Sequence, residues 1–383
     1  MRWNFGSRRS LWLALPVYIS AFIVGCGSTD EPVTTPGDDT GGASDTAVIG
    51  DGDSTDTGTT GDSGSAIDSG TTTDTGIAID TGGPPFDAGP PGSVPVIGGC
   101  AIFPADNPWN TRIDDPSKFK VHGNWSKYQT TMHLTTALHA DWGNWSTDKY
   151  GIPYATVPAT QPPVPITFTY ASESDPGPYP IPPTVKIEGG GGTTGDRHIL
   201  IIETGSCTLY ETWASLKTGS TWSAGSGAKF NLKSNALRKD GWTSADAAGL
   251  PVLPGLVRIA EVKAGAINHA IRFTMNNTQN AYIHPATHAA GLSGTDFPPL
   301  GLRLRLKASF DLTKYTGASL VILTAMKQYG VILADNGSNW YISGDSDDAW
   351  TATLMDSVSA AFGKVTGGDF EAVETGPIST VGL

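Results

Sequence analysis

A polar, acidic stretch from Gly27 to Pro95 leaves only residues 96–383 of this chain able to form a hydrophobic core. The stretch consists mainly of Asp, Thr, Gly, Ser and Pro, and it carries thirteen acidic residues and no basic one. Burial of these few apolar side chains cannot offset the conformational entropy that the segment would lose on folding. We therefore expect a disordered tether. An aspartate recurs every six residues from Asp56 to Asp80, but the apolar positions of a calcium-binding repeat are missing, which favours a solvated linker.

The tether also accounts for most of the charge. The whole chain has a formal net charge of −13, whereas residues 1–26 contain three arginines and no acid, which leaves −3 for residues 96–383. A nearly neutral domain lacks the clustered basic surface that nucleic acids require. We therefore expect no nucleic-acid partner.

The N-terminus has the organisation of an export signal. A basic start precedes an uncharged run, Leu11–Val24, that is shorter than the roughly 20 apolar residues of a membrane span. The run ends in Ile23-Val24-Gly25-Cys26, which resembles the lipobox of bacterial lipoproteins. The resemblance implies a signal peptide over 1–25, a tether over 26–95 that is attached to the membrane by a lipid on Cys26, and a domain at the outer membrane or cell surface. The alternative is an ordinary cleaved signal with a chance cysteine.

The remainder of the chain favours strands separated by Gly and Pro turns. Runs rich in β-branched and aromatic residues predict strands at Val164–Tyr170, Val185–Glu188, His198–Glu203, Thr208–Trp213, Leu256–Val262, His269–Met275, Ala281–His284, Leu302–Phe310, Val331–Ala334 and Trp340–Ser343. Apolar residues at helical spacing predict helices at Ala318–Tyr329, just before Gly330, and at Asp348–Val365. No βαβ alternation is visible, so we expect one β-rich α+β domain over 96–383, a large antiparallel sandwich or barrel with a few helices.

Two cysteines remain besides Cys26. In an oxidising compartment two thiols of one domain tend to pair, so we expect a disulfide between Cys100 and Cys207. Two separate buried thiols are the alternative.

Several runs of the domain resemble a family of uncharacterised secreted bacterial domains. These runs are Asn107-Pro-Trp-Asn110, Ser174-Asp-Pro-Gly-Pro-Tyr-Pro-Ile-Pro182, Gly195-Asp-Arg-His198, Trp242-Thr-Ser-Ala-Asp-Ala-Ala-Gly-Leu-Pro251 and Ala334-Asp-Asn-Gly-Ser-Asn-Trp-Tyr341. They cover the domain from about residue 100 to its end. Because the family has no assigned activity, the resemblance implies a domain boundary and no site.

The chain lacks the Gly-x-Ser-x-Gly, His-Glu-x-x-His, Walker and Cys-x-x-Cys motifs, so no catalytic motif identifies an active site. Strand geometry does predict one candidate general acid. In a strand over Cys207–Trp213, Glu211 shares a face with Leu209. Burial there would favour the protonated carboxyl, as in the general acid of a glycosidase. The alternatives are that Tyr210 faces the core while Glu211 points to water, and that Glu203 has this role.

A glycosidase needs a second carboxylate. Asp246 is the first candidate because it follows Trp242 in a polar loop, and Asp335, beside Asn336 in a turn, is the second. Both aspartates also suit a turn or a helix cap, where the side chain bonds its own backbone.

Histidines and one arginine complete the candidate site. His269 is a candidate base and Arg272, on the opposite face of the same predicted strand, would neutralise a uronate; Tyr210 is another base. The alternative is that His269 is a core histidine whose ring nitrogens are hydrogen-bonded within the protein. His284 and His288 have the spacing of two metal ligands on a helix, but a proline follows His284, so we expect no metal and no cofactor.

Aromatic and basic side chains predict a polysaccharide as substrate. The candidate sugar platforms, which lie among polar residues, are Trp109, Trp125, Trp142 and Trp145. The candidate stripe for an acidic polysaccharide, on one face of an alternating strand, is Arg303, Arg305 and Lys307. The alternatives are tryptophans packed onto the domain and a solvated strand face.

These features together predict a lipid-anchored, extracytoplasmic carbohydrate-active enzyme, either a glycoside hydrolase or a polysaccharide lyase. The alternative is a non-catalytic surface module that binds carbohydrate or mediates adhesion. The two predictions differ in whether the glycan is cleaved.

Overall fold

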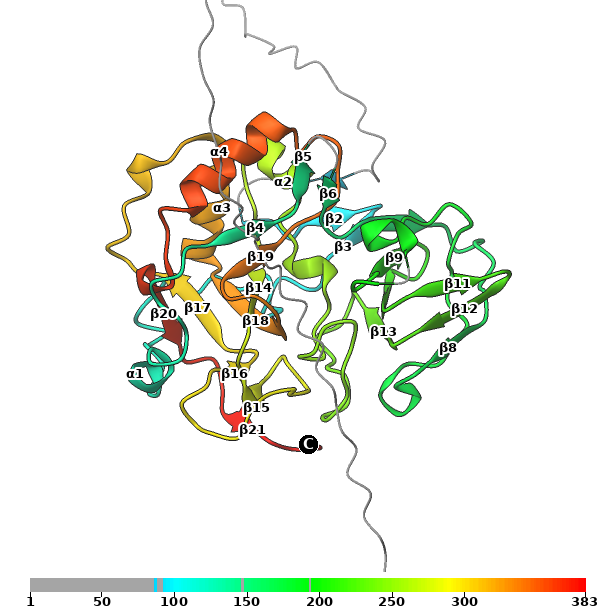
Figure 1. The fold of residues 1–383 in the computed structure, drawn as a ribbon, viewed down its shortest axis with the longest axis horizontal. Helices are drawn as coiled ribbons and strands as arrows, with labels where there is room; N and C mark the ends of the chain where they lie inside the picture. The colour runs from blue at the N-terminus through cyan, green and yellow to red at the C-terminus, as the bar shows by residue number, and fades with distance from the viewer. Residues whose placement is uncertain (1–85, 88–91, 146–147, 193) are drawn as a thin grey trace, which may run out of the picture. The chain divides into compact units, whose positions relative to one another are not determined.

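The computed structural model describes residues 86–87, 92–145, 148–192 and 194–383 (Figure 1). The predicted signal peptide, the lipidated Cys26 and nearly all of the tether lie outside the described residues, and they stay predictions. Within the described part, no helix is both long and apolar enough to cross a membrane. This part is rich in strands and contains four α-helices, which confirms the predicted β-rich α+β class.

A mixed sheet of six strands lies in the larger hydrophobic core. In spatial order its strands are β20 (Phe370–Val373), β17 (Arg303–Leu306), β18 (Val331–Asn336), β14 (Ile271–Met275), β19 (Tyr341–Ser343) and β4 (His139–Asp141). The β14–β18 and β19–β4 pairs are parallel, whereas β17 runs antiparallel to β18 and β20. The domain is therefore built from mixed as well as antiparallel sheets, none of which closes into a barrel within the described residues.

Two helices pack on this sheet. α3 (Gly317–Gln328) contacts β17, α4 (Ala352–Phe362) contacts β4, and the two helices contact each other (Figure 1). After α3 the chain turns at Gly330, where φ is +77° and a Cβ atom would lie 2.2 Å from the carbonyl oxygen of Leu304. Only glycine fits this turn, and a glycine in the left-handed conformation commonly ends a helix. Both predicted helices are confirmed, the second shorter at each end.

A second group of sheets surrounds a smaller core. The four-stranded sheet has the order β13 (Ser226–Asn231), β10 (Thr208–Trp213), β9 (Ile199–Glu203) and β7 (Tyr154–Val157), and a three-stranded sheet has the order β11 (Leu216–Thr218), β12 (Thr221–Ala224) and β8 (Ile166–Phe168). β9 and β10 form an antiparallel hairpin. Its turn carries Cys207, which is bonded to Cys100 of β3 (Cys100–Ala101) with an S–S distance of 2.06 Å.

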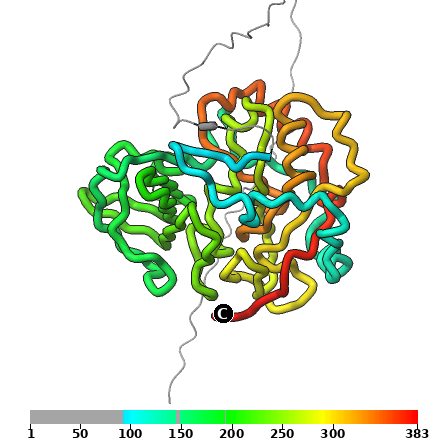
Figure 2. Tube along the Cα trace, turned by 180° about the vertical axis from the view of Figure 1, so that it is seen from behind, coloured from blue at the N-terminus to red at the C-terminus, as the bar shows by residue number. Residues whose placement is uncertain are grey.

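The predicted disulfide is thus confirmed, and a bond of this kind is typical of proteins outside the cytoplasm. Figure 2 shows how the chain near residue 100, drawn in cyan, reaches the second group of sheets and returns to the larger core. The disulfide therefore holds this excursion of the chain on the hairpin of β9 and β10.

The remaining elements are short. The strands are β1 (Phe86–Asp87), β2 (Val96–Ile97), β5 (Gly143–Trp145), β6 (Asp148–Tyr150), β15 (Gln279–Ile283), β16 (Pro299–Leu300) and β21 (Ile378–Ser379). The α-helices are α1 (Trp125–Tyr128) and α2 (Ile259–Ala264). The 3-10 helices are η1 (Ala171–Glu173), η2 (Glu188–Gly191), η3 (Leu253–Gly255), η4 (Leu312–Lys314) and η5 (Gly367–Asp369).

Two predicted strands are wrong. Val185–Glu188 forms no strand. The second half of Leu256–Val262 belongs to α2, a short helix that ends at Gly265 in a left-handed conformation.

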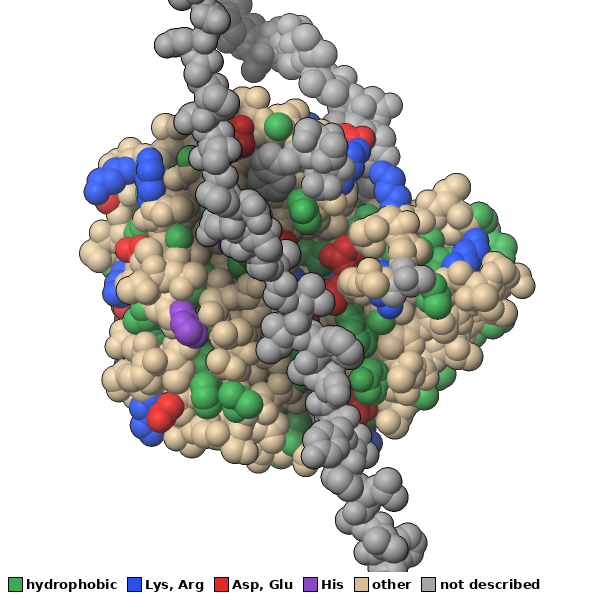
Figure 3. All heavy atoms as spheres, in the orientation of Figure 1, with side chains coloured by type: hydrophobic (Ala, Val, Ile, Leu, Met, Phe, Trp, Pro, Cys, Tyr) green, Lys and Arg blue, Asp and Glu red, His purple; other side chains and the backbone are tan. Residues whose placement is uncertain are grey.

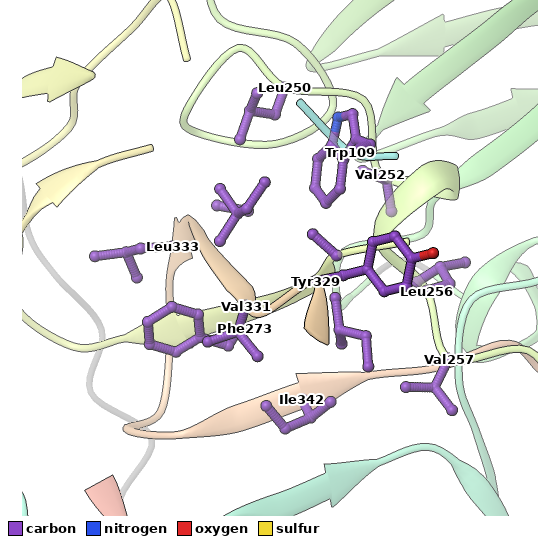
Figure 4. Close-up of a cluster of buried hydrophobic side chains, with 14 of the residues drawn as sticks. Trp109, Leu250, Val252, Leu256, Val257, Phe273, Tyr329, Val331, Leu333 and Ile342 are labelled. Carbon is purple, nitrogen blue, oxygen red and sulfur yellow. The ribbon is translucent and has the colours of Figure 1, made fainter. Parts of the chain in front are cut away.

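Tryptophans fill the larger core. Trp109 is 1% exposed, Trp142 has no exposed surface, and Trp125 is 8% exposed. Figure 4 shows Trp109 among buried aliphatic side chains, and the ring of Trp142 lies 5.5 Å from that of Trp350. Protein covers these rings, so Trp109, Trp125 and Trp142 are not available to stack on a sugar, and the predicted platform needs correction. Trp145 lies in β5, but its side chain is outside the described part.

The predicted cationic stripe also needs correction, because β17 is buried on both faces. Arg303 donates hydrogen bonds to the carbonyl oxygen of Tyr329, at 3.1 Å from Nε and 2.6 Å from Nη2. Arg305 donates to the carboxylate of Glu371 at 2.9 Å, and Lys307 donates to a backbone carbonyl. These cations bind the protein itself and present no stripe to an acidic polysaccharide.

Candidate active site

A cavity of about 430 Å³ lies where the end of β10, the loop after β13 and the end of β18 meet. This volume falls within the range of small-molecule sites. Its lining includes Tyr170, Glu173, Asp196, Trp213, His288 and Asp335. On the face drawn in Figure 3, acidic side chains lie between the larger and the smaller group of sheets. The cavity is therefore built by segments that are far apart in the chain.

Asp246 and Arg272 form a buried ion pair at the wall of this cavity. Both carboxylate oxygens of Asp246 accept hydrogen bonds from the guanidinium, one of them from Nε at 3.0 Å. Nη1 of Arg272 also donates to the hydroxyl of Ser343 on β19. Bidentate pairs of this kind hold both side chains in one orientation. The structure thus brings together two of the predicted catalytic residues.

The loop that carries Asp246 is shaped by local hydrogen bonds. The backbone N–H of Asp246 donates to the hydroxyl of Ser244 at 2.9 Å, and its carbonyl oxygen accepts from the N–H of Gly249 at 3.0 Å. At Gly249 φ is +72°, and a Cβ atom would lie 2.2 Å from the hydroxyl of Thr287. The turn therefore depends on glycine, and it aims the Asp246 side chain at β14.

Asp335 is the carboxyl of this cluster that reaches the cavity. Its side chain is 26% exposed, whereas that of Asp246 has no exposed surface. Burial, then the adjoining and hydrogen-bonded carboxylate of Asp246, raises the pKa of Asp335 well above its ordinary value, although Arg272 lies 3.8 Å away and opposes this. Like charges this close disfavour double ionisation, so Asp335 binds a proton more tightly than an ordinary aspartate while Asp246 is paired with Arg272.

Two aromatic side chains form part of the cavity wall. The ring centroids of Tyr170 and Trp213 are 6.4 Å apart with planes 31° from parallel, and Tyr170 is 50% exposed. The indole N–H of Trp213 donates to Asp196 at 3.0 Å, which fixes the ring. A Cβ atom at Gly225 would lie 2.3 Å from the Trp213 ring, so this glycine makes room for it. The wall thus offers flat apolar faces bordered by a carboxylate.

His288 contributes a ring nitrogen to the same cavity. Its Nδ1 lies 2.7 Å from the carbonyl oxygen of Ala247, which can only accept a hydrogen bond, so Nδ1 carries a proton. Nε2, 3.9 Å from a carboxylate oxygen of Glu173, is then the nitrogen that can accept a proton. In this tautomer the ring can act as a base through Nε2.

Glu211 takes no part in the cavity, and its predicted catalytic role needs correction. Its side chain faces the larger core, as predicted from β10, but it has no exposed surface. Its carboxylate accepts hydrogen bonds from the backbone N–H groups of Val252, at 2.8 Å, and Leu253, at 2.9 Å. Burial raises its pKa to about 7, the predicted direction. Because η3 covers it, Glu211 cannot touch a substrate.

His269 is also buried away from the cavity. Its Nδ1 lies 2.7 Å from the carbonyl oxygen of Ala270, and its Nε2 lies 3.0 Å from Glu261. Glu261 in turn binds Arg258 at 2.9 Å. Since both ring nitrogens have partners inside the core, the structure favours the satisfied core histidine over the predicted base.

Glu188, Asp196 and His198 place their ligand-type atoms within 4.8 Å of one another, which is a spacing compatible with a metal ion. His198 is nevertheless bonded through both nitrogens, to Glu188 at 2.6 Å and to the carbonyl oxygen of Ala245 at 3.0 Å. Burial alone would lower the pKa of His198, but the hydrogen bond and charge of Glu188 outweigh it and raise the pKa to about 9. A doubly protonated ring offers no lone pair to a metal.

His284 and His288 have the spacing of two metal ligands on a helix, but they do not lie on a helix. His284 binds Asp240 at 2.8 Å, on the exposed surface, while His288 turns to the cavity. The structure therefore separates these two histidines into different surroundings.

Sequence reasoning missed several residues of the cavity. Tyr170 and Glu173 lie just before the Ser174–Pro182 run. Three of the other runs singled out in the sequence supply lining residues: Asp196 from Gly195–His198, Asp246 from Trp242–Pro251 and Asp335 from Ala334–Tyr341. Trp213 shares a strand face with Glu211, which was a usable signal. Comparison of the chain with protein-family models, with curated proteins and with solved structures found no match in any of the three.

Proposed function

We propose that this chain is a carbohydrate-active hydrolase that acts outside the cytoplasm, with its active site in the cavity beside Asp335. One observation carries the proposal. Asp335 is a partly exposed carboxyl whose pKa burial and the Asp246 carboxylate raise well above the ordinary value. General acid catalysis needs a carboxyl that is still protonated at the working pH and that a substrate can reach.

In the proposed reaction Asp335 donates its proton to the glycosidic oxygen while the bond from that oxygen to the anomeric carbon breaks. A water molecule attacks the anomeric carbon and gives a proton to Nε2 of His288. One product carries the new hydroxyl formed with the Asp335 proton, and the other carries the hydroxyl from water. His288 then releases its proton and Asp335 regains one, so the site returns to its starting state.

Asp246 and Arg272 act through Asp335 in this proposal. The Asp246 side chain has no exposed surface, so it is a positioning residue and does not touch the substrate. Its hydrogen bond to Asp335 also brings the two carboxyls closer than the roughly 5 Å or more that separates the two carboxyls of glycosidases. We therefore assign the activation of water to His288 and not to Asp246.

The aromatic wall supports a saccharide as substrate. Tyr170 and Trp213 present flat rings beside the carboxylate of Asp196. Pyranose rings have apolar faces bordered by hydroxyls, so rings and hydrogen-bond acceptors side by side match both parts of a sugar. This wall takes the place of the tryptophans that are buried in the core.

The lyase alternative has less support, because Arg272 is 5% exposed and already binds Asp246. Three of its N–H groups donate to Asp246 and Ser343, and the Asp246 carboxylate already neutralises its charge. A non-catalytic binding module is the second candidate, and the Tyr170–Trp213 pair favours it, because stacking requires no proton transfer.

The lipid anchor at Cys26 belongs to the proposal as well, and the Cys100–Cys207 disulfide supports a location outside the cytoplasm.

The proposal can be tested with the purified full chain on a panel of polysaccharides, by counting the reducing ends released per folded molecule. Asp335→Asn should reduce the rate by about 10²–10⁴-fold while glycan binding is retained, because an amide cannot donate the proton. The control is Asp356→Asn, an exposed aspartate of α4 outside the cavity. Binding of a glycan without any cleavage by the wild-type chain would overturn the hydrolase and favour the binding module.

A further inference from the structure

The charges around the cavity indicate which saccharides it can accept. Among the described residues that line it, four are acidic and none is Lys or Arg. Arg272 neutralises Asp246 and lies 3.8 Å from Asp335, whose pKa is raised, so Glu173 and Asp196 supply most of the remaining negative charge. The cavity is therefore unfavourable for anions.

The cations near these carboxylates are bound to other partners. His198, whose ring lies within 4.8 Å of Asp196, pairs with Glu188 at 2.6 Å. Arg238 donates to the carboxylate of Asp175, and to the backbone carbonyl oxygen of Glu173 at 2.9 Å, so its contact with Glu173 leaves that side chain's charge in place. Arg197 donates to the carbonyl oxygen of Ser215 at 3.1 Å. Neither arginine neutralises the carboxylates that line the cavity.

The aromatic wall lines the same cavity as the two carboxylates. Trp213 donates its indole N–H to Asp196, while Tyr170 begins the segment that carries Glu173 in η1. Ring faces attract cations through their quadrupole, most strongly for Trp and Tyr, and an adjoining carboxylate adds a direct charge interaction. Two rings with two carboxylates beside them form a site for a small cation carried on an apolar body.

We propose that the saccharide taken by this cavity carries free amino groups, so that an ammonium group lies against the Tyr170–Trp213 wall and binds Glu173 and Asp196. The inference rests on the proposed function, since it names the substrate class of the same site. A uronate would meet two carboxylates and neither a Lys nor an Arg, and an N-acetylated sugar would lose the charge interaction. Polymers of glucosamine have the chemistry that the wall fits.

The test measures binding of glucosamine oligomers, of the same oligomers N-acetylated and of uronate oligomers to the purified full chain by calorimetry. The glucosamine oligomer should bind about tenfold more tightly than its acetylated counterpart, and this preference should weaken as salt is added. Glu173→Gln and Asp196→Asn should each reduce the preference without unfolding the protein, because both carboxylates lie at the rim of the cavity. Asp356→Asn should leave the preference unchanged.

Three results would overturn the inference: equal binding of both glucosamine forms, tighter binding of the uronate, and competition by calcium ions at the same carboxylates in place of any sugar preference. Cleavage of a neutral glycan without an amine preference would reject the inference and keep the hydrolase. Tight binding of the glucosamine oligomer without cleavage would reject the hydrolase and keep the inference.

Discussion

Arg272 binds both carboxylate oxygens of Asp246, although 26 positions separate them in the chain and neither side chain is more than 5% exposed. The pair joins the loop after β13 to the central strand β14. It also leaves Asp335, on the neighbouring strand β18, as the carboxyl of the cluster that keeps a proton. Stability and the proposed chemistry therefore depend on the same contact.

Breaking this pair on one side should be costly. Arg272→Met would leave the Asp246 carboxylate buried without its partner, and the free energy of unfolding should fall by about 3–5 kcal/mol. The double variant Arg272→Met with Asp246→Asn should recover part of the loss, because no buried charge remains. Urea unfolding of both variants checks this, and a single variant as stable as the wild type would contradict it.

The pH profile of hydrolysis should report on Asp335. The rate should fall as the pH rises through its raised pKa, because the ionised carboxyl cannot donate a proton. Asp246→Asn removes the carboxylate that helps to raise this pKa, so the decline should move to lower pH. A profile in Asp246→Asn that coincides with that of the wild type would show that Asp246 is merely structural.

Glu211 should make the domain less stable as the pH rises. Its pKa of about 7 in the folded protein lies above the ordinary 4.5, so the folded state holds a proton that the unfolded chain loses between these values. The free energy of unfolding should decrease over this interval by an amount on the order of 3 kcal/mol. Glu211→Gln should lack this contribution.

The comparison between wild type and Glu211→Gln isolates this effect. Burial raises the pKa of Asp345 to about 7 as well, so the wild-type curve contains more than one titration. Asp345 is present in both proteins, and the difference between their unfolding free energies at pH 4 and pH 8 therefore reports on Glu211. A constant difference across this range would contradict the assignment.

The disulfide between Cys100 and Cys207 should contribute strongly to stability. It closes a loop with a sequence separation of 107, for which the chain-entropy model gives up to about 4.7 kcal/mol. Reduction, or Cys100→Ser with Cys207→Ser, should lower the midpoint of thermal unfolding. Both thiols reacting with an alkylating agent in unfolded, non-reduced wild-type protein would show that the bond does not form.

Lipid attachment at Cys26 stays a prediction, since this residue lies outside the described part. Cys26→Ser should abolish incorporation of labelled fatty acid in a bacterial host, because the thiol is the acceptor of the lipid. The parallel variant Cys100→Ser should keep the label. Unchanged labelling in Cys26→Ser would reject the lipoprotein.

Local patterns in the sequence determined several of the main elements of this fold. The runs at Thr208–Trp213, His198–Glu203 and Val331–Ala334 predicted β10, β9 and β18, because short runs rich in β-branched and aromatic residues between turns favour strands. The disulfide followed by elimination, since two cysteines remained after Cys26. Asp246 and Asp335 were also recognised, as polar residues in a loop and a turn, and Arg272 was recognised as a cation on one face of a predicted strand.

Only the tertiary structure decided which polar groups reach the cavity. Glu211 and Asp335 both lie in strands, but η3 covers Glu211 with its backbone N–H groups, whereas the end of β18 stays open. The arginines of β17 found carbonyl partners that the strand pattern could not reveal. Whether a charged side chain is solvated, paired or exposed depends on segments distant in the chain, and this information is absent from any local pattern.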